Sequence, residues 1–153
     1  MNIFPFFKSK PFFTDAEKNR IVNAIVNAEK QTSGEVRIYV ESKNPLVSTM
    51  DRAGEVFYNL KMDKTDNRNA VLLYMATKHK EIALFADEGI FKACGTDYWN
   101  SIVKNIIIDF KKEDIVTGTE KCIQSIGEAL KEKFPYDNVS DKNELPDNII
   151  FGK

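Results

Sequence analysis

The sequence predicts a single α/β domain, an α/β/α sandwich in which a small mixed β-sheet is flanked by helices on both faces. Three observations support this fold class. The chain has 153 residues, a length typical of one domain that buries roughly 70% of the surface its unfolded form exposes. Three short segments alternate apolar with polar residues or are apolar throughout, which is typical of β-strands. Four longer segments repeat apolar residues at helical spacing, so helices and strands share one chain.

The first helix is expected over residues 15–32. Thr14 and Glu17 have the spacing of a capping box, in which each side chain bonds the other residue's backbone N–H. One apolar face follows, formed by Ile21, Ala24, Ile25 and Ala28. Gly34 is expected to end this helix in a left-handed turn.

The first strand is predicted over residues 35–42, which read EVRIYVES. Its apolar side carries Val36, Ile38 and Val40, and its other side carries Arg37, Tyr39 and Glu41. This alternation indicates a strand with one polar side, or with one side facing a site. For Arg37 the alternative to contacting a substrate is an ion pair with Glu35 or Glu55.

A second helix is predicted after Ser48, which has capping-box spacing to Asp51. Its apolar face carries Met50, Ala53, Phe57 and Leu60. Residues 69–76 are apolar on both sides, which predicts a central strand. The helix between these two strands allows a parallel crossover. Residues 77–80 are short enough for a hairpin into an antiparallel strand over 81–86.

Two further helices are predicted, one starting at Thr96 and one over about 115–133 that Pro135 ends. The chain therefore divides into an N-terminal segment of residues 1–13, a domain of residues 14–134, and a tail of residues 135–153. The tail has no clear period. We expect it to lie extended across the domain.

Composition excludes several classes of function. The net charge is −1 and the basic residues form no block, so nucleic acid is not an expected partner. No apolar stretch approaches the ~18 residues of a transmembrane segment, and the N-terminus lacks the pattern of a secretory signal. Cys94 and Cys122 lack a metal or redox spacing, and we expect reduced thiols in a cytoplasmic protein.

Oxygen-bearing side chains gather on either side of the predicted hairpin. Asp63, Asp66 and Asn69 precede the central strand, and Asp87 and Glu88 follow the next strand. The hairpin would bring both turns to one end of the sheet. Carboxylate and amide oxygens without Cys or His suit a hard cation such as Ca²⁺ or Mg²⁺. The alternative is that these residues only form turns, where Asp and Asn are common.

Four segments of the chain resemble the TPM domain family: SGEVRIYVE (33–41), DNRNAVLLYMA (66–76), ALFADEGI (83–90) and NELPDNIIFG (143–152). The resemblance covers nearly the whole chain. It implies an α/β/α sandwich, a divalent-cation site reported as calcium in some members, and a proposed acid phosphatase activity. Many members carry a signal peptide or a transmembrane helix, whereas this chain resembles the short soluble branch.

The resemblance also implies positions for the site. The family's strand-end acid falls on Asp87, and its acidic loop falls near Asp63 and Asp66. Its Asn-Gly pair falls on Asn69-Ala70, so the glycine is missing here, and the glycine that many relatives have before the acid is Ala86. Both departures place a Cβ where backbone could otherwise approach closely.

Three functions follow from these observations. The first is a divalent-cation-binding domain that acts as a regulatory or interaction module, with ligands from Asp87, Asp66, Asn69, Asp63 and Glu88. The second is a low-specificity, metal-dependent acid phosphatase for phosphate monoesters. Its catalytic residues are not determined, and the candidates are Arg68, Asp87 and Arg37. The third is a metal-free domain that binds a protein partner.

Overall fold

A computed structural model describes residues 12–46, 48–112, 115–136 and 148–152 of the chain. Along the chain these residues form α1 (Asp15–Glu29), β1 (Glu35–Glu41), α2 (Thr49–Asn59), the 3₁₀ helix η2 (Met62–Lys64), β2 (Ala70–Ala76), β3 (Glu81–Ala86), α3 (Glu88–Cys94), α4 (Thr96–Lys111), α5 (Ile115–Lys133) and β4 (Ile149–Phe151). Expectations for residues 1–11 and 137–147 lie outside the described residues.

The four strands form one mixed sheet in the order β3-β2-β1-β4. β1 and β2 are parallel, with Glu35 opposite Ala70 at the start of the pair. β2 and β3 are antiparallel, with Val71 opposite Ala86. The predicted crossover and hairpin are therefore both confirmed. The tail contains β4, a strand that the sequence did not predict. β4 pairs in parallel with β1.

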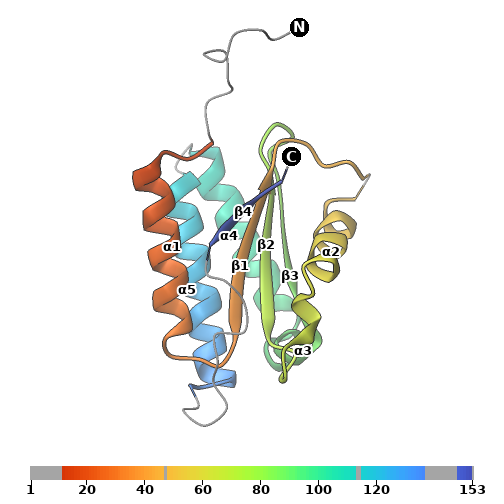
Figure 1. The fold of residues 1–153 in the computed structure, drawn as a ribbon, viewed down its shortest axis with the longest axis vertical. Coiled ribbons are helices and arrows are strands. Elements are labelled where there is room, and N and C mark those ends of the chain that lie inside the picture. Colours follow the sequence, from red (N-terminus) through yellow and green to blue (C-terminus); the bar gives the residue numbers. More distant parts are fainter. Residues whose placement is uncertain (1–11, 47, 113–114, 137–147, 153) are drawn as a thin grey trace, which may run out of the picture.

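Helices cover both faces of this sheet, as predicted (Figure 1). α5 packs against both α1 and α4, and these three helices cover one face, while α2 covers the other. Every residue of β2 is buried, which follows from its apolar side chains pointing alternately into the two layers. β2 is the central strand that its composition indicated.

The polar side of β1 is buried rather than exposed. Glu41 accepts hydrogen bonds from Arg52 Nε and Nη2, at 2.8 Å and 2.9 Å, and from the Tyr74 hydroxyl. Arg52 also pairs with Glu55 on α2, whereas the carboxylates that act on Arg37 are those of Glu35 and Glu29. Burial opposes ionisation of Glu41, but the hydrogen bonds from Arg52 and Tyr74 outweigh it and lower the pKa of Glu41. This network ties α2 to the sheet.

The structure corrects two local predictions. α1 ends at Glu29 rather than at residue 32, and Gly34 does not have a positive φ. Gly34 instead allows close packing, because a Cβ there would lie 3.1 Å from the Asn69 carbonyl oxygen and against the Leu130 side chain. Residues 88–94 form α3, a helix that the sequence did not predict. Such a short helix leaves little periodicity to detect.

Candidate functional site

The turn before β2 and the turn after β3 meet at one end of the sheet, as predicted. The Asp87 N–H donates to the Ala70 carbonyl at 2.9 Å and so extends the hairpin by one pair. The Arg68 carbonyl accepts from the N–H groups of Gly89 and Ile90, at 2.9 Å and 3.3 Å. Figure 1 shows α3 at this end of the sheet, beside the start of β2. The backbone of residues 65–69, here called the 65–69 turn, is therefore docked on the start of α3.

A bidentate ion pair joins the same two segments. Arg68 donates from Nε to Asp87 Oδ2 at 2.7 Å and from Nη2 to Asp87 Oδ1 at 2.8 Å. Asp87 Oδ1 also accepts from the Glu88 N–H at 2.8 Å. The Asp87 side chain is only 2% exposed, whereas that of Arg68 is 37% exposed. The ion pair is thus a buried carboxylate covered by a guanidinium at the surface, a strong and geometrically specific arrangement.

Arg68 is the centre of a small acidic group. Its Nη1 lies 3.3 Å from Glu88 Oε1. The hydrogen bonds to Asp87 raise the pKa of Arg68 above its ordinary value, and the negative charges of Asp87, Glu88 and Asp63 raise that pKa further. One guanidinium, with a single positive charge, therefore lies among carboxylates supplied by both turns.

The backbone of the 65–69 turn is held in a specific shape. Arg68 has φ 51°, a left-handed conformation that residues other than glycine seldom adopt. The Arg68 N–H donates to the Thr65 carbonyl, and the Asn69 N–H donates to Thr65 Oγ1. Buried Met62 anchors the preceding η2. These contacts place the Arg68 side chain beside α3.

The remaining predicted ligands are distributed differently. Asn69 Nδ2 donates to Ser33 Oγ at 3.3 Å, so its side chain contacts the turn before β1. Asn69 Oδ1 is buried and has no hydrogen-bond partner among the residues that the structure describes. Asp63 lies 3.7 Å from Lys64 Nζ, and Asp66 is exposed. The structure thus brings Asp87 and Glu88 together around Arg68 and directs the Asn69 side chain elsewhere.

Arg37 is not part of the Arg68–Asp87 ion pair. It is buried on β1, and burial lowers its pKa while the carboxylates of Glu35 and Glu29 oppose that shift. The predicted neighbour Glu35 is therefore one source of compensating charge, and Glu29 from the end of α1 is a second.

Glu35 lies near this end of the sheet and was not predicted as a site residue. Glu35 is paired with Ala70 across β1 and β2, and Ala70 bonds Asp87. Paired residues on neighbouring strands point their side chains to the same face of a sheet. Glu35 and Ala70 therefore point to the same face of the sheet, and Glu35 and Asp87 are both buried. The sequence feature that indicates this residue is an acid at the first position of the polar side of β1.

The donor chemistry of this end of the sheet fits a hard cation, since the side chains facing Arg68 offer oxygen alone. A preformed site is nevertheless not present among the described residues. No three His, Cys, Asp or Glu side chains among them are grouped as metal ligands. Both oxygens of Asp87 are engaged by Arg68, so the chain itself supplies one positive charge to this carboxylate.

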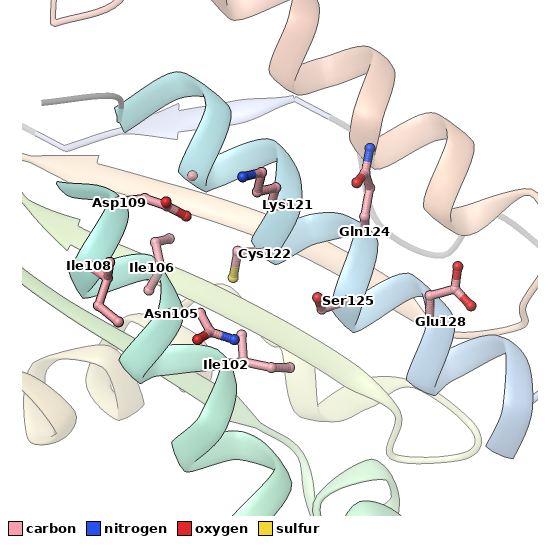
Figure 2. Close-up of a pocket in the computed structure, with 11 residues that line it drawn as sticks. Ile102, Asn105, Ile106, Ile108, Asp109, Lys121, Cys122, Gln124, Ser125 and Glu128 are labelled. Atoms are coloured by element: carbon pink, nitrogen blue, oxygen red, sulfur yellow. The ribbon is translucent and has the colours of Figure 1, made fainter. Parts of the chain in front are cut away.

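A separate groove of about 530 Å³ lies between α4 and α5 (Figure 2). Asp109, Lys121 and Glu128 line it, and Cys122 lies between the two helices. Burial raises the pKa of the Cys122 thiol to about 12, so this cysteine is protonated at neutral pH and is a poor nucleophile. This groove carries no activated group, and the Arg68–Asp87 end of the sheet is the better candidate.

The fold and this end of the sheet define an α/β/α sandwich with a paired carboxylate at a strand end. The model of the TPM domain matches residues 7–129, and the chain belongs to this family. No curated protein matches the chain. Among the described residues, none of the helices has both the length and the apolar character needed to span a bilayer.

Two solved structures support the fold. The chain is similar to the NMR structure of the BA42 protein from the psychrophilic bacterium Bizionia argentinensis, with 38% sequence identity and a TM-score of 0.86. That match covers 95% of this chain and 99% of the other. The N-terminal domain of the cg2496 protein from Corynebacterium glutamicum has 9% identity and a TM-score of 0.62, covering 78% of this chain and 74% of that one. The second likeness concerns the fold alone.

Proposed function

We propose that this TPM domain is a non-enzymatic module that binds a divalent cation, Ca²⁺ or Mg²⁺, where the 65–69 turn meets α3. The observation that carries the proposal is the buried Asp87 carboxylate, which lies where two distant turns meet and has Glu88 beside it. Asp87 and Glu88 would supply the ligand oxygens. A cation bound to Asp87 and Glu88 would link the two turns by its charge. In this way the cation would order a surface that binds a partner.

Hydrolysis of phosphate monoesters is the weaker alternative. It would need a cationic group available to the phosphate and an activated nucleophile or water. Arg68 is engaged by Asp87 and Glu88, and Arg37 is buried beside Glu35. The engagement of Arg68 and the burial of Arg37 support binding over catalysis.

The test is replacement of Asp87 by asparagine, which keeps the shape and removes the charge. We expect the affinity for Ca²⁺ and Mg²⁺ to fall by about tenfold or more, because the carboxylate is a direct ligand. Calorimetric titration of chelator-treated protein measures the affinity, and amide NMR shifts of residues 65–69 and 87–90 locate the binding.

Asp66→Asn is the matched control. Asp66 is exposed and precedes Arg68 by two positions, so we expect it to leave the affinity unchanged. Equal affinities of wild type and Asp87→Asn would remove Asp87 from the site. If neither the wild type nor Arg68→Gln binds Ca²⁺ or Mg²⁺, the proposal is overturned. The remaining function is then a metal-free domain that binds a protein partner.

A further inference from the structure

β3 forms one edge of the sheet and pairs only with β2 (Figure 1). The Asp87 N–H donates to the Ala70 carbonyl. Bonded and non-bonded residues alternate along an antiparallel pair, so the odd-numbered residues of β3 are the ones that bond β2. The N–H and carbonyl groups of Ile82, Leu84 and Ala86 therefore point away from the sheet. Among the described residues, no turn or loop hydrogen bond reaches these groups.

β3 lacks the features that usually protect an edge strand. Such strands tend to be very short or bulged, or they carry a charged residue or a proline. β3 has six residues and pairs with β2 without a bulge, and it is apolar from Ile82 to Ala86. Ile82, Phe85 and Ala86 are partly exposed. The opposite edge is β4, which has only three residues. β3 is therefore the edge that is suited to accept another strand.

We propose that β3 pairs with β3 of a second copy of this chain, antiparallel about a two-fold axis at Leu84. In this register Ile82 lies opposite Ala86 of the second copy, and Leu84 lies opposite its own counterpart. The outward-pointing residues of the two copies then bond one another. A shift in either direction would leave some of them without a partner. The dimer would contain one continuous sheet that runs through both copies.

Side-chain size supports this register. On the face covered by α2, Phe85 would lie opposite Ala83 of the second copy, and on the other face Ile82 would lie opposite Ala86. Each of these pairs sets a large side chain beside a small one, which favours close packing between strands. Tyr58 is 52% exposed and packs against Phe85, with ring centroids 5.8 Å apart. An exposed aromatic residue beside the edge is typical of an interface.

Charge is complementary in the same register. Beyond the strand ends, Lys80 would lie opposite Glu88 of the second copy, and the symmetry produces this pairing twice. Lys80 is exposed, and the Glu88 side chain is 56% exposed. Glu81 would lie opposite Asp87, but the Asp87 carboxylate is buried and already bonded to Arg68. The outer charges of the edge therefore attract a second copy.

The experiment is sedimentation equilibrium of chelator-treated protein from about 10 µM to about 1 mM, because edge pairing is expected to be weak. We expect the mass of wild type to rise from that of a monomer to that of a dimer. Lys80→Glu would place two acids opposite each other. We expect it to weaken dimerisation by roughly fivefold to tenfold, since each substitution acts twice. Lys80→Glu combined with Glu88→Lys should restore the affinity.

Lys78→Glu is the matched control. It makes the same change of charge in the same turn, but the Lys78 N–H donates to the Ser42 carbonyl at the end of β1, on the side of β2 away from the free edge. We expect this variant to dimerise as wild type does.

Hydrogen exchange gives a second readout that needs no variant. We expect the amides of Ile82, Leu84 and Ala86 to exchange quickly in dilute protein and more slowly as the concentration rises. The amides of Ala83 and Phe85 bond β2 and should be protected at every concentration. This alternation along one strand would identify β3 as the edge that pairs.

The outcomes are distinct. A dimer that Lys80→Glu weakens and the double variant restores, with slowed exchange at residues 82, 84 and 86, would support the proposal. A dimer without these effects would have its interface elsewhere and would overturn it. A monomer at every concentration would also overturn it, and would leave the edge to an extended segment of another protein. The chelator makes each result independent of the proposed cation site.

Discussion

Replacement of Gly89 by alanine is expected to lower the free energy of unfolding by about 3 kcal/mol, the upper end of the usual cost of overpacking. A Cβ at this position would run into the Asn67 carbonyl oxygen and would lie 2.7 Å from the Arg68 carbonyl oxygen. Both obstacles are backbone atoms of the 65–69 turn, so a side-chain rotation cannot relieve the contact. The turn has to move away from α3, which stretches the hydrogen bonds from Gly89 and Ile90 to Arg68.

The measurement is urea unfolding of Gly89→Ala, with hydrogen exchange of the amides of residues 65–69 as the local readout. Gly54→Ala is the matched control. The three atoms nearest to its Cβ would all belong to the Phe85 ring, the first at 3.1 Å, and alanine gains about 1 kcal/mol of helix propensity over glycine inside α2. We expect the control to be close to wild type. Equal stability of Gly89→Ala and wild type would show that the turn is not tightly docked.

Replacement of Glu41 by glutamine is the second large effect, with an expected loss of about 3 kcal/mol, the lower end of the cost of removing one partner of a buried ion pair. Glu41 accepts from Arg52 and from the Tyr74 hydroxyl, and both donors would lose their charged acceptor. Glu55→Gln is the control, because Glu55 pairs with the same arginine but is 44% exposed. Exposed pairs contribute less than about 1 kcal/mol.

The dependence of stability on pH tests the same network. The pKa of Glu41 is lower in the folded protein than its ordinary value of 4.5. A carboxyl group of this kind stabilises the fold above its unfolded pKa, and the contribution is lost as pH falls through the folded pKa. Over roughly pH 5 to 3, wild type should therefore lose more stability than Glu41→Gln. Parallel losses in urea midpoint for the two proteins would contradict the assignment.

Local chemistry determined most of the framework from the sequence. Thr14 and Ser48 cap the helices that they were expected to begin, because a capping side chain bonds backbone only three positions away. The last helix spans residues 115–133 as predicted. β2 was recognised as central because a strand that is apolar on both faces has to be covered on both. Periodicity and capping depend on near neighbours, so a single sequence is enough to read them.

The tertiary structure alone decided how the site is assembled. The sequence located the two turns and their acids, but Arg68 and Asp87 are 19 positions apart, and no local pattern shows that the arginine would hold that carboxylate. Asn69 was expected beside Asp87, yet its side chain bonds Ser33 from the turn before β1. β4 was unforeseen, since its three residues become a strand only beside β1. Pairings between distant residues depend on the strand register and on the direction in which each turn points its side chains. Both are determined only when the sheet is assembled.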